Sequence, residues 1–117
     1  MIQETVHAEW VRERVFLLRD RNNFPVVMTQ PMGVSGADLL PMSLIGCTMW
    51  DTIAILEKKR QKVTGFRASA ESVRDKEPPW IFREIHICYV FIGHKLDHKQ
   101  VQSAIEISEQ KYWVVVK

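Results

Sequence analysis

The stretch of sequence that decides the fold is residues 38–61, DLLPMSLIGCTMWDTIAILEKKRQ. Apolar residues recur there at steps of three and four, which predicts one long helix. Pro41 falls in the predicted first turn, where a proline removes no hydrogen bond, and Asp38 is placed to cap the free N–H groups. The apolar positions make two stripes: Leu39, Met42, Ile45, Met49, Ile53 and Leu56, and Leu40, Leu44, Cys47, Trp50 and Ala54. A helix that is apolar nearly all round is expected to be buried.

Length and composition limit the fold class and the location. The chain has 117 residues, enough for a single domain over residues 1–117, and its 46% hydrophobic and 26% charged residues are typical of a globular protein. The net charge of +2 gives no reason to expect nucleic acid or an anionic membrane as a partner. No apolar run reaches the roughly 20 residues that cross a bilayer, and the N-terminus lacks a signal-peptide core. We therefore expect a cytoplasmic protein.

The rest of the pattern predicts strands on both sides of the central helix and a second helix at the end. A polar turn at residues 20–23 joins strands of an N-terminal antiparallel meander, and the KEPP break at 76–79 separates a second antiparallel pair. Asp97 and Gln100 form a capping box for the last helix, which turns Ala104, Ile105 and Ser108 inward. The predicted elements are strands 5–11, 13–19 and 25–29, helix 38–61, strands 65–73 and 81–92, and helix 97 to about 112. This order indicates an α+β fold.

Cys47 is the candidate reactive group, and two interpretations of it stay open. A cysteine in a buried helix is usually a small hydrophobic residue. Gly46, however, lets a ligand or another backbone come close beside the thiol, and Asp51 is a charge one turn on that needs a partner if buried. A reactive thiol also needs positive charge nearby, which would have to come from an arginine elsewhere in the chain.

The other chemical groups give weaker signals. Cys88 alternates with Ile87 and Tyr89, so we expect it on the opposite face of its strand, unable to pair with Cys47. Two cysteines make no disulfide framework and are expected to be thiols. The histidines have no metal-ligand spacing and no nucleotide-binding glycine pattern is present, so neither a metal nor a cofactor is expected.

The run GADLLPMSLIGCTMWDTIAILEKKRQ at residues 36–61 resembles the OsmC/Ohr superfamily, the osmotically inducible and organic hydroperoxide resistance proteins, and most closely its YhfA-like branch. The likeness covers nearly the whole chain after the N-terminal strands. The residues that carry it are Gly46, Cys47, Thr48, Asp51, Ile55, Leu56 and Lys58 in the helix, then Arg74, Glu77, Pro79 and Phe82, then Ala104, Ile105 and SEQKY at 108–112.

The resemblance implies an OsmC-like fold: N-terminal antiparallel hairpins, a long buried central helix, a second antiparallel sheet segment and a C-terminal helix, in an intertwined homodimer. It implies that Cys47 is a peroxide-reducing thiol, with Arg19 as the matching arginine that holds the thiolate and with Gly46, Asp51 and Asp38 around it. Relatives of the peroxidase type carry a second, resolving cysteine after the last helix, and Trp113 stands at that position here. A truncated or frame-shifted C-terminus would explain that difference.

The function expected from the resemblance is that of a thiol-dependent redox protein of the hydroperoxide-reducing type, an oxidoreductase of the oxidative stress response with impaired turnover. Its partners would be a second copy of the chain, a small organic hydroperoxide and a thiol reductant. The alternative is a non-catalytic dimer that binds a small apolar ligand and has lost peroxidase activity. The two differ in whether Cys47 is a thiolate at neutral pH.

Replacing Trp113 by cysteine should raise the turnover of hydroperoxide, because a sulfenic acid without a second thiol waits for an external reductant or oxidises further. The change removes a large aromatic side chain and can cost about 3 kcal/mol of stability if that side chain packs in the core, so folding is checked in parallel. Steady-state peroxide consumption by wild type, Trp113→Cys and Cys47→Ser is the measurement. Brisk consumption by Cys47→Ser would show that the thiol is not involved.

Overall fold

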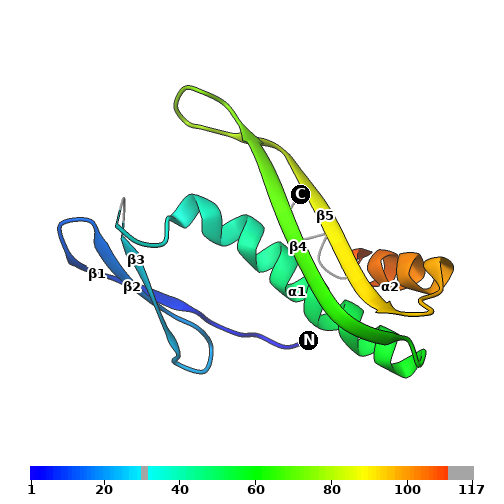
Figure 1. Ribbon diagram of the computed structural model, residues 1–117. Coiled ribbons are helices and arrows are strands. Elements are labelled where there is room, and N and C mark those ends of the chain that lie inside the picture. Colours follow the sequence, from blue (N-terminus) through cyan, green and yellow to red (C-terminus); the bar gives the residue numbers. More distant parts are fainter. Residues whose placement is uncertain (30–31, 111–117) are drawn as a thin grey trace. The chain divides into compact units, whose positions relative to one another are not determined.

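The computed structural model describes residues 1–29 and 32–110. It has two compact units, Met1–Leu40 and Pro41–Lys117, and each is described by itself. The elements follow the predicted order (Figure 1). They are β1 (His7–Arg12), β2 (Val15–Arg19), β3 (Pro25–Thr29), α1 (Gly36–Lys58), β4 (Lys62–Arg74), β5 (Phe82–His94) and α2 (His98–Gln110).

The first unit contains the predicted meander. Strands β1, β2 and β3 form an antiparallel sheet in that order, with Phe16 opposite both Trp10 and Met28. The turn before β3 forms because the Asp20 carboxylate accepts from the N–H groups of Asn22 at 2.9 Å and Phe24 at 2.8 Å. None of the residues in β1, β2 or β3 is buried, so this sheet leaves both faces accessible.

Helix α1 begins two residues earlier than predicted, and Ser35 caps it. The Ser35 Oγ accepts from the N–H of Ala37 at 3.2 Å, and its carbonyl accepts from the N–H of Asp38 at 3.1 Å. The prediction that Asp38 is the cap is therefore wrong, and Asp38 lies inside the first turn. Pro41 is also inside the helix, where its ring removes the hydrogen bond to the Ala37 carbonyl.

The C-terminal end of α1 is closed by two backbone hydrogen bonds that form a Schellman motif. The N–H of Arg60 donates to the carbonyl of Glu57 at 3.0 Å, and the N–H of Gln61 donates to that of Leu56 at 2.9 Å. Arg60 is at the position where glycine is usual, with φ of 58°. The helix thus ends at Lys58, before the predicted residue 61.

The second unit contains the hairpin of β4 and β5, each 13 residues long, and helix α2. The hairpin loop is closed by Asp75, whose N–H donates to the Ile81 carbonyl at 3.0 Å. Its carboxylate accepts from Nε and Nη2 of Arg83 at 2.9 and 2.8 Å. Asp97 caps α2 as predicted, since its Oδ1 accepts from the N–H of Lys99 at 2.9 Å.

The second half of the predicted capping box is wrong. The Asp97 N–H donates to the Gln61 side chain at 2.9 Å, and Gln100 instead accepts from Lys59 Nζ at 2.7 Å. Both contacts join the end of α1 to the start of α2. Gln61, which is distant in the sequence, therefore takes the place that the capping box gives to Gln100. The fold brings the end of α1 next to the start of α2, so Gln61 is within reach of the Asp97 N–H.

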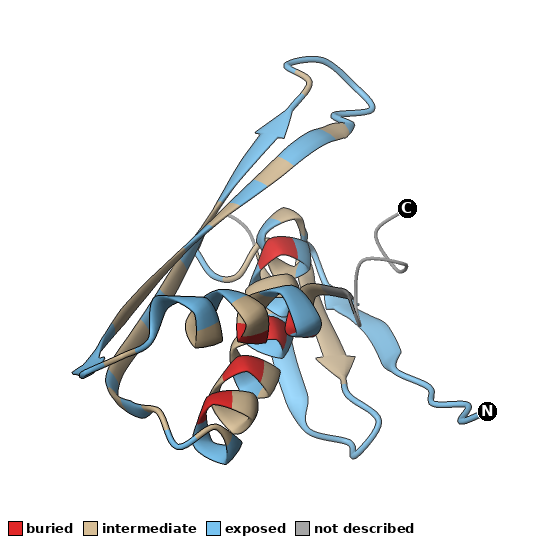
Figure 2. Cartoon of the chain, turned by 90° about the vertical axis from the view of Figure 1, so that its right-hand side faces the viewer, coloured by how far each residue is buried: buried red, intermediate tan, exposed pale blue. Residues whose placement is uncertain are grey.

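The buried residues of the second unit lie on α1 and α2 (Figure 2). Thr52 Oγ1 donates to Ser108 Oγ at 2.9 Å, and Ser108 Oγ donates to the Ala104 carbonyl at 2.8 Å. Ala104 and Ser108 point inward as predicted. The buried face of α1 is not either predicted stripe, since Leu56 alone among the stripe residues is buried. The buried positions of α1 are Pro41, Thr48, Thr52 and Leu56.

By length and composition alone, α1 is long and apolar enough to cross a membrane, so the expectation that no stretch reaches that length is corrected. The core helix of a soluble protein meets the same criteria. Asp51 lies within this helix, and two of the buried residues of the helix, Thr52 and Thr48, contact α2 and β5.

Replacing Arg60 by glycine should raise the free energy of unfolding by about 1 kcal/mol, because the left-handed conformation costs a side-chain-bearing residue roughly that much. Arg60→Ala is the matched control, since it removes the guanidinium but keeps the strained φ. Urea denaturation of the three proteins measures the difference. Equal gains in both variants would assign the effect to charge instead of backbone strain.

Candidate functional site

Cys47 lies near the middle of α1, and its thiol is exposed in the chain. Ser43, Gly46 and Trp50 share the same exposed face, and the Trp50 side chain is 77% exposed. The next residue, Thr48, is 3% exposed and faces the core. Cys47 is therefore exposed in the single chain, and both interpretations of it stay predictions.

Gly46 leaves open space beside the thiol. Apart from the neighbouring residues and the backbone of α1 itself, a Cβ built at this position would meet no heavy atom of the described residues within 4 Å. This agrees with the expectation that Gly46 gives room for a ligand or another backbone. Asp51 follows Cys47 by one helical turn and is half-buried.

Arg19 is the last residue of β2, in the first unit. Its guanidinium donates to the carbonyl of Asn23 at 2.9 Å, within the turn that joins β2 to β3. Cys47 belongs to the second unit, so the pairing of Arg19 with the thiol stays a prediction. Trp113 lies outside the described residues.

A hydrogen-bonded cluster on the core side of Thr48 is a feature that sequence reasoning missed. Tyr89 of β5 donates its O–H to Glu109 of α2 at 3.3 Å, and its phenol also contacts the Thr48 side chain, which lowers the Tyr89 pKa. Thr48 Oγ1 in turn donates to the Leu44 carbonyl at 2.8 Å. Burial raises the pKa of Tyr89 to about 12, and the nearby Glu109 carboxylate adds to that rise. The signal for this cluster was a tyrosine alternating with apolar residues, since an inward phenol needs a polar partner.

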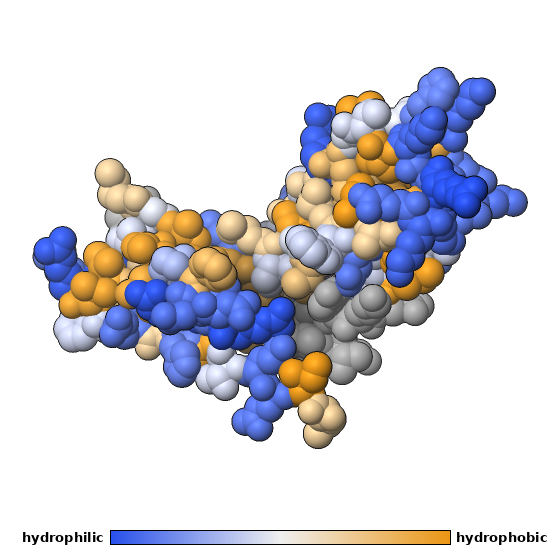
Figure 3. All heavy atoms as spheres, turned by 90° about the horizontal axis from the view of Figure 1, so that it is seen from below, coloured by the Kyte–Doolittle hydropathy of each residue, from blue (hydrophilic) through white to orange (hydrophobic). Residues whose placement is uncertain are grey.

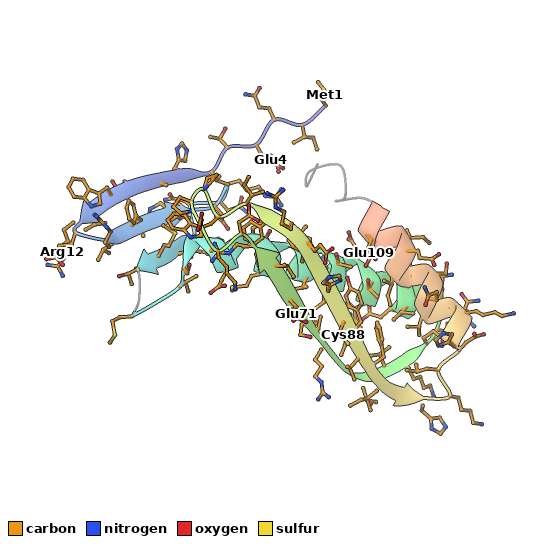
Figure 4. The ribbon with its side chains drawn as sticks, turned by 90° about the horizontal axis from the view of Figure 1, so that it is seen from above. Met1, Glu4, Arg12, Glu71, Cys88 and Glu109 are labelled. Atoms are coloured by element: carbon orange, nitrogen blue, oxygen red, sulfur yellow. The ribbon has the colours of Figure 1, made fainter. Side chains whose placement is uncertain are left out.

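Cys88 lies on the other face of the hairpin. Tyr89 contacts α1 and α2, so the adjacent Cys88 faces away from both helices, as predicted, and it is exposed and free (Figure 4). Ser69 is its partner across the hairpin, and on the same face the His86 ring nitrogen lies 2.7 Å from the Glu84 carboxylate. Among residues 1–29 and 32–110, no three histidine, cysteine or acidic side chains are grouped as a metal would need.

Several known proteins are similar to this chain in sequence and fold. A family model described as OsmC-like protein matches residues 29–117. Protein YhfA of Escherichia coli K12 is 28% identical over 108 residues, which are 90% of this chain and 81% of YhfA. The crystal structure of a hypothetical protein from Aquifex aeolicus VF5 is 30% identical with a TM-score of 0.84, covering 96% of this chain and 83% of that one.

A more distant structure shows the same fold. A Psychrobacter arcticus protein assigned to osmotic stress induction and the detoxification response has a TM-score of 0.74 at 18% identity, covering 93% of this chain and 83% of that one. At this identity the likeness is one of fold alone. Together these matches support the predicted mixed α+β architecture with two antiparallel sheets and two helices.

Tyr89 should ionise later than an ordinary tyrosine. Its pKa is about 12 in the folded chain, against about 10 in the unfolded chain. Because folding raises this pKa, the stability contributed by the neutral phenol is complete below a pH of about 10 and is lost as the pH rises towards about 12.

An ultraviolet titration of the phenolate measures this, and Tyr89→Phe should remove the late step. The chain has only one other tyrosine, Tyr112. Loss of the early step in Tyr89→Phe, with the late step retained, would contradict the assignment.

Proposed function

Because the chain belongs to the OsmC-like family, we propose that it is a thiol-dependent redox protein that reduces small organic hydroperoxides through Cys47. The observation that carries the proposal is the exposed thiol in the middle of α1, within the Gly46, Cys47, Thr48 sequence of the family's central helix. The family match supports a peroxide-related role, and the substrate and chemistry are our proposal.

The reaction has two stages. The Cys47 thiolate attacks one oxygen of the hydroperoxide, the O–O bond breaks, and the other oxygen leaves with a proton as an alcohol. The sulfur is thereby oxidised to sulfenic acid. An external thiol then attacks this sulfur and releases water, and a second thiol reduces the mixed disulfide and restores Cys47. External thiols are needed because Trp113 stands where relatives carry the resolving cysteine, and because Cys88 faces away from α1.

Arg19 is proposed to stabilise the thiolate. A thiol becomes nucleophilic at neutral pH when positive charge lies close to it, and Cys47 is too far inside α1 to gain much from the helix dipole. A guanidinium has five N–H donors, so the hydrogen bond from Arg19 to the Asn23 carbonyl leaves others for a thiolate.

The protein is proposed to act as a homodimer in the cytoplasm, without nucleic-acid or membrane partners. Hydrophobic residues reach the surface among charged ones in the single chain (Figure 3). In the second unit the exposed face of α1 includes Trp50, and in the first unit both faces of the β1–β2–β3 sheet are accessible. An obligate dimer interface buries on the order of 2,000 Å² or more of such surface.

A second candidate function is favoured by one observation, the tryptophan at position 113. A family member without the resolving cysteine can keep the dimer pocket to bind a small apolar ligand without turnover. In that case Cys47 would be a protonated thiol at neutral pH and would react slowly with peroxide.

Mass spectrometry of the protein after treatment with tert-butyl hydroperoxide tests the proposal. We expect one added oxygen on Cys47, which a thiol reductant reverses, and conversion to sulfinic acid under excess peroxide. Cys88→Ser should behave as wild type, and Arg19→Ala should slow the oxidation of Cys47. Oxidation of Cys88 alone, or none at either cysteine, would favour the binding protein.

A further inference from the structure

One end of the second unit is strongly basic. It consists of residues 57–62, from the end of α1 into β4, and residues 94–100, from the end of β5 into α2, and we call it the basic end. These two segments hold six of the chain's sixteen lysines and arginines and two of its fourteen acidic residues. The remaining ten basic and twelve acidic residues leave the rest of the chain slightly negative. The positive charge of the chain is therefore concentrated here.

Contacts between the two segments hold these charges together (Figure 1). Lys62 pairs with His94 across the hairpin, and the Gln61 side chain accepts from the N–H of Asp97 at 2.9 Å. Among residues 1–29 and 32–110, the ion pairs all lie elsewhere. The exposed cations of the basic end, none of which is in an ion pair within the described residues, are Lys58, Arg60, Lys62, Lys95 and Lys99.

This concentration of positive charge opposes local stability. Lys99 lies in the first turn of α2, which has no acidic residue, although the partial positive charge of a helix N-terminus favours acidic side chains. Arg60 and Lys95 have left-handed backbone, with φ of 58° and 51°, a conformation that glycine adopts more easily. Residues held in unfavourable conformations are concentrated at functional sites. An anionic partner would offset the repulsion between these cations and the opposed helix dipole.

The basic end begins on the face of α1 that carries the thiol. Lys58 follows Cys47 by eleven residues, and at about 100° per residue the two side chains leave the helix within roughly 20° of each other. Both are exposed, and they are about 16 Å apart along the helix axis. At physiological ionic strength an electrostatic field decays over about 8 Å, so these cations attract a small anion to the thiol only weakly. A protein in contact with the basic end can extend over the whole distance.

We infer that the basic end is the docking surface for an acidic dithiol protein, which supplies the external thiols that restore Cys47. The inference rests on the proposed function and names the class of its reductant. One thiolate of the partner attacks the sulfenic sulfur, the S–O bond breaks, and the oxygen leaves as water with a proton. The partner's second thiol then breaks this mixed disulfide, which releases the Cys47 thiolate and leaves the disulfide in the partner.

The basic end is expected to stay accessible in the proposed dimer, because lysines are depleted from the cores of protein interfaces. Its composition favours an acidic protein over nucleic acid or a membrane. It contains no Phe, Tyr or Trp on which a base could stack, and its one apolar residue, Leu96, is half-buried and so gives little to insert into a bilayer. Five of its six basic residues are lysines, which lack the forked donors with which arginine binds phosphates. Charge complementarity with a carboxylate-rich protein surface needs none of these features.

Thiol–disulfide exchange at Cys47 tests the docking surface without peroxide. In full-length protein carrying Cys88→Ser, Cys47 is converted to its mixed disulfide with thionitrobenzoate. The probe is a peptide with one cysteine, a Gly-Ser spacer of about eight residues, which spans at most roughly 28 Å, and a run of glutamates. The peptide thiolate attacks the Cys47 sulfur, the S–S bond breaks, and the absorbance of the released thionitrobenzoate gives the rate. A matched peptide carries glutamines in place of the glutamates.

At about 0.15 M ionic strength, the glutamate peptide should react about tenfold more slowly once three cations of the basic end are neutral, because docking raises the local concentration of its thiol. The variant combines Lys62→Gln, Lys95→Gln and Lys99→Gln. The glutamine peptide should react equally with this variant and with the parent chain. Mercaptosuccinate, a small anionic thiol, should also lose less than about twofold, because the field at Cys47 is screened.

The matched control removes three exposed cations of the hairpin that lie outside the basic end and combines Arg67→Gln, Arg74→Gln and Lys76→Gln. It has the same net charge as the first variant and should keep the fast rate. Equal slowing in both variants, an unchanged rate in the first, or an equal loss for mercaptosuccinate would overturn the inference. Submicromolar binding of duplex DNA or of phosphatidylserine vesicles, lost only in the first variant, would overturn it as well.

The exchange assay also separates the docking surface from the proposed function. If exchange depends on the basic end but peroxide does not oxidise Cys47, the docking surface stands and its redox role falls with the proposed function. If peroxide oxidises Cys47 but the exchange rate is independent of these cations, the docking surface alone falls. Circular dichroism shows whether each variant is folded.

Discussion

The hydrogen bond between Thr52 of α1 and Ser108 of α2 is the contact on which the second unit depends. Both side chains are fully buried, and a buried hydroxyl without a partner would cost about 1–3 kcal/mol. Thr52 donates to Ser108, which donates to the Ala104 carbonyl, so both protons are used. The small size of these three residues lets the two helices approach closely. The contact therefore fixes the rotation of α1 about its axis.

That rotation places the thiol. Successive residues of a helix are separated by about 100°, so a helix with Thr48 and Thr52 inward must turn Cys47 towards the side. Tyr89 contacts Thr48 from the hairpin and so supports the same rotation, and Glu109 accepts from the Tyr89 hydroxyl. The packing that builds the core of the second unit is thus the packing that exposes Cys47, Gly46 and Trp50.

The family relationship and the geometry contribute different parts of the functional argument. The chain's membership of the OsmC-like family is the reason for proposing the thiol of α1 as the reactive group, since Cys88 is exposed as well. The geometry adds that this thiol lies on an exposed face of the helix, beside Gly46. Arg19 and Cys47 belong to different units. The stabilisation of a Cys47 thiolate by the Arg19 guanidinium therefore stays a prediction.

The sequence by itself determined the order and type of the elements, because turn chemistry and alternation are local. It predicted β3 at the observed residues, the Asp97 cap of α2 and the outward face of Cys88. The start of α1 also has a local signal, Ser35 followed three residues later by Asp38. The prediction placed the start at Asp38 instead, because proline is favoured in the first turn of a helix and Pro41 was assigned to that turn.

Only the tertiary structure decided which face of α1 is buried. Both sides of that helix are rich in apolar residues, so its sequence gives no preferred rotation. The choice was made by Ser108 and Tyr89, which lie on other elements and need Thr52 and Thr48 as partners. Contacts between residues far apart in the chain have no local pattern. The alternation in its strand marked Tyr89 as inward, but the sequence could not show that Thr48 and Glu109 are its partners.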